Sequence, residues 1–123
     1  MTIFAKRLVA AVLATASLMA FAAPGSATAL FGWRVSGVSS GDLLNVRAYP
    51  SSGSRILVGY PNGARLSLTG RCTDGVHLND VSGLANWQQR QAVRYSWCEA
   101  WLDPEGGGEF RNGWVYGRYI TPG

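Results

Sequence analysis

The sequence predicts a small all-β domain over residues 30–123, with one long insertion that carries a short helix. Short apolar stretches alternate with clusters of Gly, Pro, Ser, Asn and Asp, which is typical of strands joined by turns. No long segment of this region shows the apolar periodicity of a helix. Two turn signals, "YPNGAR" at residues 60–65 and "DPEGGGEF" at residues 103–110, separate apolar stretches as hairpin turns do.

Residues 1–29 have the pattern of a secretory signal peptide. Lys6 and Arg7 form a short positive region, an apolar run follows to residue 23, and Ala27-Thr28-Ala29 resembles a small-x-small cleavage site. The alternative is a membrane anchor, but the run is shorter than the roughly 20 residues that a spanning helix needs. We therefore expect an exported protein, periplasmic or extracellular, whose mature form has no membrane segment.

Export would also change the charge of the chain. Loss of Lys6 and Arg7 lowers the basic residues from 11 to nine against seven acids, and the net charge from +4 to +2. This weak positive charge gives little electrostatic reason for nucleic-acid binding, so no nucleic acid is expected as a partner.

Six strands are expected along the domain. In the second, Leu44 and Val46 lie on the inward face, while Asn45 and Arg47 point outward. Asn62-Gly63 forms the tight turn between the third and the fourth. The expected strands are residues 33–38, 43–47, 55–60, 65–71, 93–102 and 113–116.

Residues 73–92 do not fit this rhythm, because the segment is long for a loop in so small a domain. Leu84, Trp87 and Gln91 fall at helical spacing, which predicts a short helix near residues 85–91. Cys72 and Cys98 flank the insertion.

The two cysteines predict one disulfide, because an even count in a small exported domain is typical of disulfide bonding. Two buried free thiols are the alternative. A zinc site is not expected, since His77 is the only histidine and the spacing is unsuitable. In the chain-entropy model, closing a loop of this length adds roughly 3.5 kcal/mol of stability.

Two segments, "LNVRAYPSSGSRILVGYPNGARLSL" and "NGWVYGRYI", resemble the bacterial SH3 (SH3b) domain family of exported and cell-wall proteins. The residues that match the family pattern in order are Leu44, Asn45, Val46, Arg47, Pro50, Ile56, Gly59, Pro61, Gly63, Gly113, Trp114, Val115, Tyr119 and Ile120.

The resemblance implies an SH3-like barrel of five to six strands, with the stretch after Arg47 comparable to the RT loop. The sequence departs from the family in two places. Tyr49 stands where the family usually has glycine, and the insertion between the cysteines is longer than the usual connection.

Catalysis is not expected. His77 has no recognisable nucleophile around it, and Cys98 would be silenced by bonding to Cys72. Asp103, Glu105 and Glu109 cluster in a glycine-rich turn, which is a poor platform for a glycosidase pair or a calcium loop. No cofactor or metal is expected.

The aromatic residues are more informative, because a domain this small cannot bury five Trp and five Tyr completely. The expected ligand-binding residues are Arg47, Tyr49 and Tyr116, in a shallow groove, and Trp87 on the insertion. Arg47 has two interpretations: a structural side chain that donates to loop carbonyls or pairs with an acid such as Asp42, or a ligand contact.

Two functions remain open. The resemblance implies a non-catalytic binding module that recognises peptidoglycan or a peptide segment in the cell envelope, since SH3b domains commonly target cell-wall enzymes. The alternative is a periplasmic protein–protein interaction or structural factor that uses the insertion at residues 73–92. The expected partner is peptidoglycan or an envelope protein, and the mature protein is expected to be a monomer.

Overall fold

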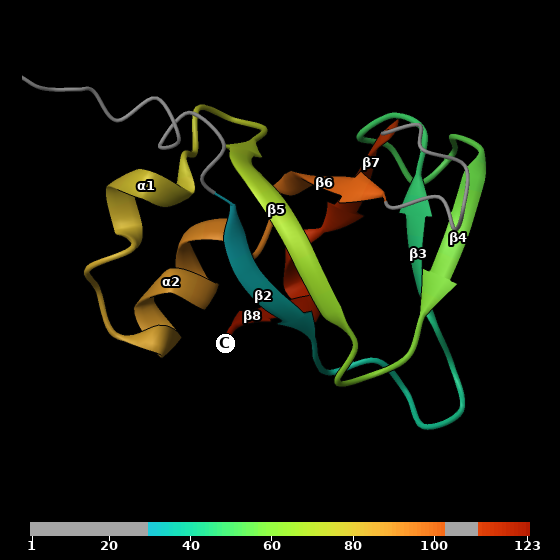
Figure 1. Cartoon of the computed structure of the whole chain (residues 1–123), viewed down its shortest axis with the longest axis horizontal. Helices are drawn as coiled ribbons and strands as arrows, with labels where there is room; N and C mark the ends of the chain where they lie inside the picture. The colour runs from blue at the N-terminus through green and yellow to red at the C-terminus, as the bar shows by residue number, and fades with distance from the viewer. Residues whose placement is uncertain (1–29, 103–110) are drawn as a thin grey trace, which may run out of the picture.

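Seven β-strands form one sheet in the computed structural model, which describes residues 30–102 and 111–123 (Figure 1). All neighbouring strands are antiparallel, in the order β4-β3-β7-β6-β5-β2-β8. The strands are β2 (Phe31–Val35), β3 (Leu44–Arg47), β4 (Ile56–Tyr60), β5 (Arg65–Cys72), β6 (Trp97–Leu102), β7 (Arg111–Tyr116) and β8 (Ile120–Pro122). The all-β prediction is confirmed. The expected signal peptide and the glycine-rich turn with its three acids lie outside the described residues.

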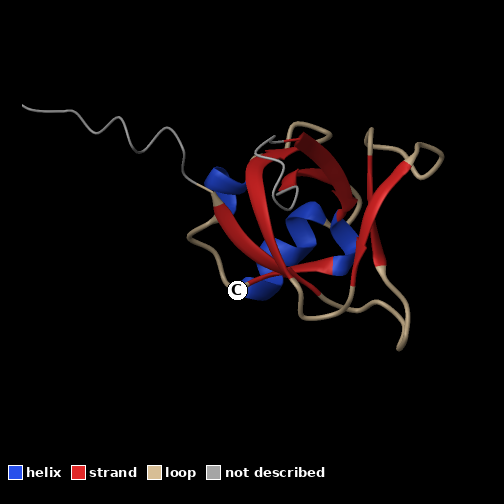
Figure 2. Cartoon of the chain, turned by 45° about the vertical axis from the view of Figure 1, so that its right-hand side comes forward, coloured by secondary structure: helices blue, strands red, loops and turns tan. Residues whose placement is uncertain are grey.

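The sheet curls strongly but is not closed, because β4 and β8 each have one strand neighbour in the described chain (Figure 2). The closed SH3-like barrel is therefore not confirmed. The strand count of five to six was too low, because Ile120–Pro122 forms an additional edge strand by pairing with β2. Three residues ending at a proline show no period of their own, so only the tertiary pairing defines this strand.

Two short helices occupy the insertion, α1 (Leu78–Val81) and α2 (Asn86–Val93), and they lie away from the β3–β4 hairpin (Figure 1). The helix expected at residues 85–91 is thus present. The side chain of Gln88 accepts a hydrogen bond from the Ala85 N–H at 3.1 Å, which satisfies a donor at the start of α2. No described helix is long and apolar enough to cross a membrane.

The strand expected at residues 93–102 begins later, at Trp97, because α2 extends to Val93. Val93 is fully buried from the helix, and the Ser96 N–H donates to the Val93 carbonyl at 2.8 Å in the turn that follows. The β propensity of Val93 predicts a strand, but in the fold Val93 ends α2 and packs into the core from there.

The core lies inside the curl of the sheet. Alternate residues of β5 are buried, and Leu44 and Val46 of β3 face inward as expected. Gly113 allows β7 to approach β3, since a Cβ at this position would collide with the Val46 side chain. The buried core residues are Trp33, Val35, Leu44, Val46, Leu66, Leu68, Cys72, Leu78, Val93, Cys98, Ala100, Leu102, Val115 and Ile120.

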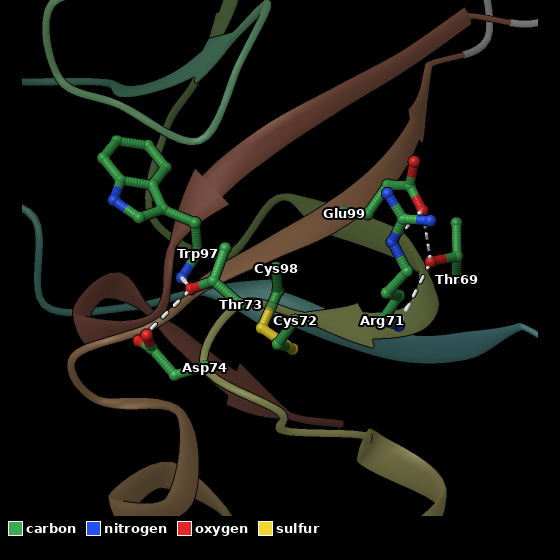
Figure 3. The surroundings of a disulfide bond; sticks show 8 residues. All are labelled: Thr69, Arg71, Cys72, Thr73, Asp74, Trp97, Cys98 and Glu99. Atoms are coloured by element: carbon green, nitrogen blue, oxygen red, sulfur yellow. Dashed lines mark hydrogen bonds and ion pairs between the residues drawn. A yellow bond between two sulfur atoms is a disulfide. The ribbon is translucent and has the colours of Figure 1, made fainter.

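The predicted disulfide between Cys72 and Cys98 is present and lies within the core (Figure 3). The two cysteines face each other in the β5–β6 pair, with their Cα atoms 4.0 Å apart. The bond therefore joins the two ends of the insertion to the centre of the sheet.

Candidate functional site

A groove of about 830 Å³ lies between the loops around β3 and the ends of β6 and β7. The loop after β2 and the loop after β3 form two of its walls. Aromatic side chains from β6, β7 and the segment after β7 form the remaining lining. The lining residues are Gly37, Val38, Ser39, Asp42, Leu43, Leu44, Asn45, Arg47, Pro50, Ser51, Ser52, Trp97, Tyr116, Arg118 and Tyr119. We call this the aromatic groove.

Three aromatic rings follow one another in the aromatic groove. Trp97 and Tyr116 are direct cross-strand partners in β6 and β7, and their ring centroids lie 5.2 Å apart. The short 3-10 helix η4 (Gly117–Tyr119) then brings Tyr119 to 6.3 Å from Tyr116. Both pairs are tilted, which is a favourable arrangement for aromatic rings. The row offers apolar ring faces together with the polar O–H and N–H groups at the ring edges. A peptide or a sugar can pack on the faces and hydrogen-bond to these groups.

The base of the insertion holds Trp97 in place (Figure 3). The Trp97 N–H donates to the Thr73 Oγ1 at 2.9 Å, and the Thr73 N–H donates to the Trp97 carbonyl at 2.8 Å. Each of these residues follows or precedes a bonded cysteine directly. The disulfide and this pair of hydrogen bonds therefore fix the backbone from which the Trp97 ring projects.

Charged and polar side chains complete the aromatic groove. Arg47 donates from Nη1 to the Ser54 carbonyl at 2.8 Å, which holds the loop after β3 in place. Arg118 lies with its guanidinium 5.8 Å from the centroid of Tyr119. Asp42 lines the same groove, so charges of both signs are available there. A ligand with a carboxylate and an amine, or an extended peptide, suits this combination.

The structure brings two of the four predicted ligand-binding residues together. Arg47 and Tyr116 both line the aromatic groove. Tyr49 is 70% exposed on the loop after β3 but is not among the lining residues. Trp87 is 61% exposed on α2 and lies in a different hollow. The hydrogen bond to Ser54 agrees with the structural interpretation of Arg47, while its contact with a ligand stays a prediction.

The residues of the aromatic groove that sequence reasoning missed include three large side chains, those of Trp97, Arg118 and Tyr119. The sequence "YGRY" shows that the two tyrosines are three residues apart. It does not show the 3-10 helix that places both rings in one row. Trp97 is the first residue of β6, so strand alternation within the expected strand at residues 93–102 does not single it out. The cross-strand register that pairs Trp97 with Tyr116 could not be obtained from either segment alone.

A second hollow, of about 250 Å³, lies between α2 and η4. Its lining residues are Trp87, Arg90, Gln91, Arg94, Gly117 and Arg118. We call it the arginine hollow. It is separate from the aromatic groove, although Arg118 lines both.

Glu99 is a buried carboxylate on β6, and its partners lie on the neighbouring strands β5 and β7. It accepts a hydrogen bond from Thr69 Oγ1 at 3.0 Å, and Arg71 Nε lies 3.8 Å away (Figure 3). It also accepts a hydrogen bond from Asn112 Nδ2 at 2.6 Å. The Arg71 guanidinium also lies 5.5 Å from the centroid of Trp114. This cluster joins β5, β6 and β7 and has the character of a structural network.

Groups suited to catalysis are scarce in the described residues. Both cysteines are in the disulfide, so neither offers a thiolate nucleophile. His77 is exposed at the edge of the insertion, and residues 30–102 and 111–123 contain no cluster of three or more metal-ligating side chains.

The comparisons with known proteins give no family for this chain. A scan against protein-family models and searches of curated proteins and solved structures each returned no match. The resemblance to SH3b domains is thus carried by the sequence motifs alone.

Proposed function

We propose that this chain is an exported, non-catalytic binding module of SH3b type that recognises peptidoglycan or a peptide segment in the cell envelope through its aromatic groove. The observation that carries the proposal is the row of Trp97, Tyr116 and Tyr119 beside Arg47 and Asp42. Aromatic faces supply contact area at low cost in conformational entropy, and the arginine can bind a carboxylate.

The ordered SH3b motifs support the proposal, because "LNVR" forms β3 and "GWVY" forms part of β7, and both strands contribute to the aromatic groove. The disulfide in the core and the lack of a membrane-spanning helix among the described residues are compatible with export. Stem peptides of peptidoglycan combine short peptide chains with free carboxylates, and the aromatic rings and arginines of the groove complement both parts.

Co-sedimentation with purified peptidoglycan tests this function. We expect the parent protein to bind, and Tyr116→Ala to weaken binding by about 1–2 kcal/mol, the scale of an aromatic hot spot. Tyr95→Ala is the matched control, because Tyr95 is exposed and lines neither hollow. Circular dichroism must show that both variants are folded. A parent protein that neither co-sediments nor binds soluble muropeptides would contradict the proposal.

A protein–protein interaction factor is the second candidate, favoured by the exposed indole of Trp87 on the insertion. A large apolar side chain that is mostly exposed on a short helix is typical of an interface anchor. Under this alternative, Trp87→Ala abolishes capture of an envelope protein and Tyr116→Ala does not. The reverse result supports the aromatic groove.

A further inference from the structure

We propose that the arginine hollow is a binding site for a phosphate-type anion with two or more negative charges, separate from the aromatic groove. The juxtaposition that carries the proposal is Arg90, Arg94 and Arg118 around one small hollow, with the exposed Trp87 at its side. The inference does not depend on the function proposed above, because it concerns another hollow and another ligand chemistry.

The hollow is formed by one face of α2 and by the closing segment. Trp87, Arg90, Gln91 and Arg94 follow one another at intervals of three, one and three residues, which places them on one side of the helix. The opposite side carries the buried Gln89 and Val93 toward the core. Gly117 and Arg118 of η4 close the hollow from the other chain segment.

The positive charge of the hollow is not neutralised within the described chain. The one ion pair found in residues 30–102 and 111–123 joins Arg71 to Glu99, and neither of these residues lines the hollow. Arg90 lies in the last turn of α2 and Arg94 caps its C-terminus, so the two like charges are four residues apart, a spacing that destabilises a helix end slightly. The negative C-terminal end of the helix dipole offsets part of this cost, but it does not pair the two guanidinium groups with a carboxylate.

The three guanidinium groups also keep hydrogen-bond donors available. Arg90 donates to Thr121 Oγ1 at 3.4 Å, and Arg94 donates to the Tyr95 hydroxyl at 3.3 Å. Arg118 stacks near Tyr119 and makes no hydrogen bond to another described side chain or carbonyl. A guanidinium has five N–H donors, so most donors around the hollow can reach a ligand.

Charge and size together select the anion. Three positive charges at one hollow match a phosphate monoester or a diphosphate better than a single carboxylate, and arginine binds phosphate oxygens in pairs. A hollow of about 250 Å³ accommodates a group of this size. The Trp87 ring can stack on a planar or apolar part of the same ligand.

An NMR titration of the exported protein with pyrophosphate, at an ionic strength held constant with potassium chloride, tests the site. We expect saturable shifts of the Trp87 indole N–H and of the Arg90 and Arg94 side-chain N–H signals. Arg90→Gln and Arg94→Gln should each weaken binding about tenfold. Arg55→Gln removes the same charge from the β3–β4 connection and should change affinity by less than about twofold.

A stability measurement separates binding from folding. Relief of the Arg90–Arg94 repulsion opposes the loss of the helix-dipole interaction and of the long Arg90–Thr121 hydrogen bond, so we expect each glutamine variant to melt close to the parent temperature. Co-sedimentation with vesicles that contain phosphatidic acid, whose headgroup is a phosphate monoester, is compared with phosphatidylcholine vesicles and shows whether a lipid headgroup or a soluble compound presents the phosphate. Loss of vesicle binding in Arg90→Gln assigns a headgroup, and pyrophosphate binding without vesicle binding assigns a soluble source.

The proposal is overturned if pyrophosphate gives no saturable shifts, or if potassium chloride alone produces the same shifts. It is also overturned if Arg90→Gln and Arg94→Gln bind pyrophosphate as tightly as Arg55→Gln. Failure of peptidoglycan binding leaves these outcomes unchanged, since Tyr116 does not line the arginine hollow.

Discussion

Arg47 belongs both to the fold and to the wall of the aromatic groove. Its Nη1 atom donates to the Ser54 carbonyl at 2.8 Å, and this contact closes the loop between β3 and β4. The side chain is half-buried, so its hydrogen bond is partly shielded from water. Hydrogen bonds from a charged donor contribute more to stability than neutral ones do.

We therefore predict that Arg47→Gln lowers the free energy of unfolding by about 1–2 kcal/mol in urea denaturation. Arg55→Gln is the control, since Arg55 is exposed and loses the same charge. Equal stability of the Arg47 variant and the parent would show that the loop contact is not important for the fold. A loss of peptidoglycan affinity in Arg47→Gln beyond that explained by unfolding would identify Arg47 as a ligand contact as well.

Local sequence predicted the burial or exposure of individual residues well where strand alternation or a turn determines it. Leu44 and Val46 are buried, and the ring of Tyr49 is exposed, as expected. The partners of Tyr116 could not be predicted in the same way. Trp97 lies 19 positions earlier in the chain and becomes its neighbour only through the β6–β7 register.

At the scale of elements, Gly117 determines how closely η4 approaches the end of α2. Its N–H donates to the Ser96 carbonyl at 2.7 Å, and a Cβ at this position would collide with the Val93 carbonyl. This contact involves rigid backbone, which cannot move aside as a flexible side chain can. The same close approach positions Tyr116 and Tyr119, on either side of the glycine, in the aromatic groove.

We predict that Gly117→Ala lowers the free energy of unfolding by about 2 kcal/mol or more, because the chain must shift to admit the methyl group. Gly32→Ala is the matched control, since nothing lies within 4 Å of a Cβ there and its backbone is that of an ordinary strand. Thermal unfolding of both variants checks the prediction. It is wrong if both alanine variants melt at the same temperature.

The disulfide connects the insertion to the sheet at the element scale. Its two cysteines are 26 positions apart in the sequence, and both helices lie between them. The double variant C72A/C98A should be less stable than the parent by roughly 3.5 kcal/mol in the chain-entropy model. Urea denaturation with and without reductant measures the effect. Reductant should leave the double variant unaffected, and a parent protein that is equally insensitive to reductant would contradict this role.

The sequence also predicted most elements but not all of their ends. The tight turn at "YPNGAR" and the helix in the insertion are present, because turn residues and helical spacing are local signals. The hairpin predicted at this turn is wrong, since the turn joins β4 to β5 and these two strands pair with other strands and not with each other. The start of β6 and the whole of β8 depend on burial of Val93 and on pairing with β2. Such tertiary effects override local propensity, so these boundaries could not be obtained from the sequence.

At the scale of the whole molecule, the curled sheet separates two surfaces. The helices of the insertion lie toward one end and the β3–β4 hairpin toward the other, with β2 and β5 between them (Figure 1). The aromatic groove uses loops near the hairpin, whereas the arginine hollow uses α2. Composition predicted that some aromatic residues must stay exposed, but only the topology divides them between two sites.

Amide chemical-shift mapping with purified muropeptides is the sharpest test of ligand binding in the aromatic groove. We expect saturable shifts concentrated on Asn45, Arg47, Tyr116, Arg118 and Tyr119, together with the Trp97 indole N–H. These residues line one groove although they come from distant parts of the chain. Shifts concentrated on α2, or no saturable shifts at all, would contradict binding in the aromatic groove.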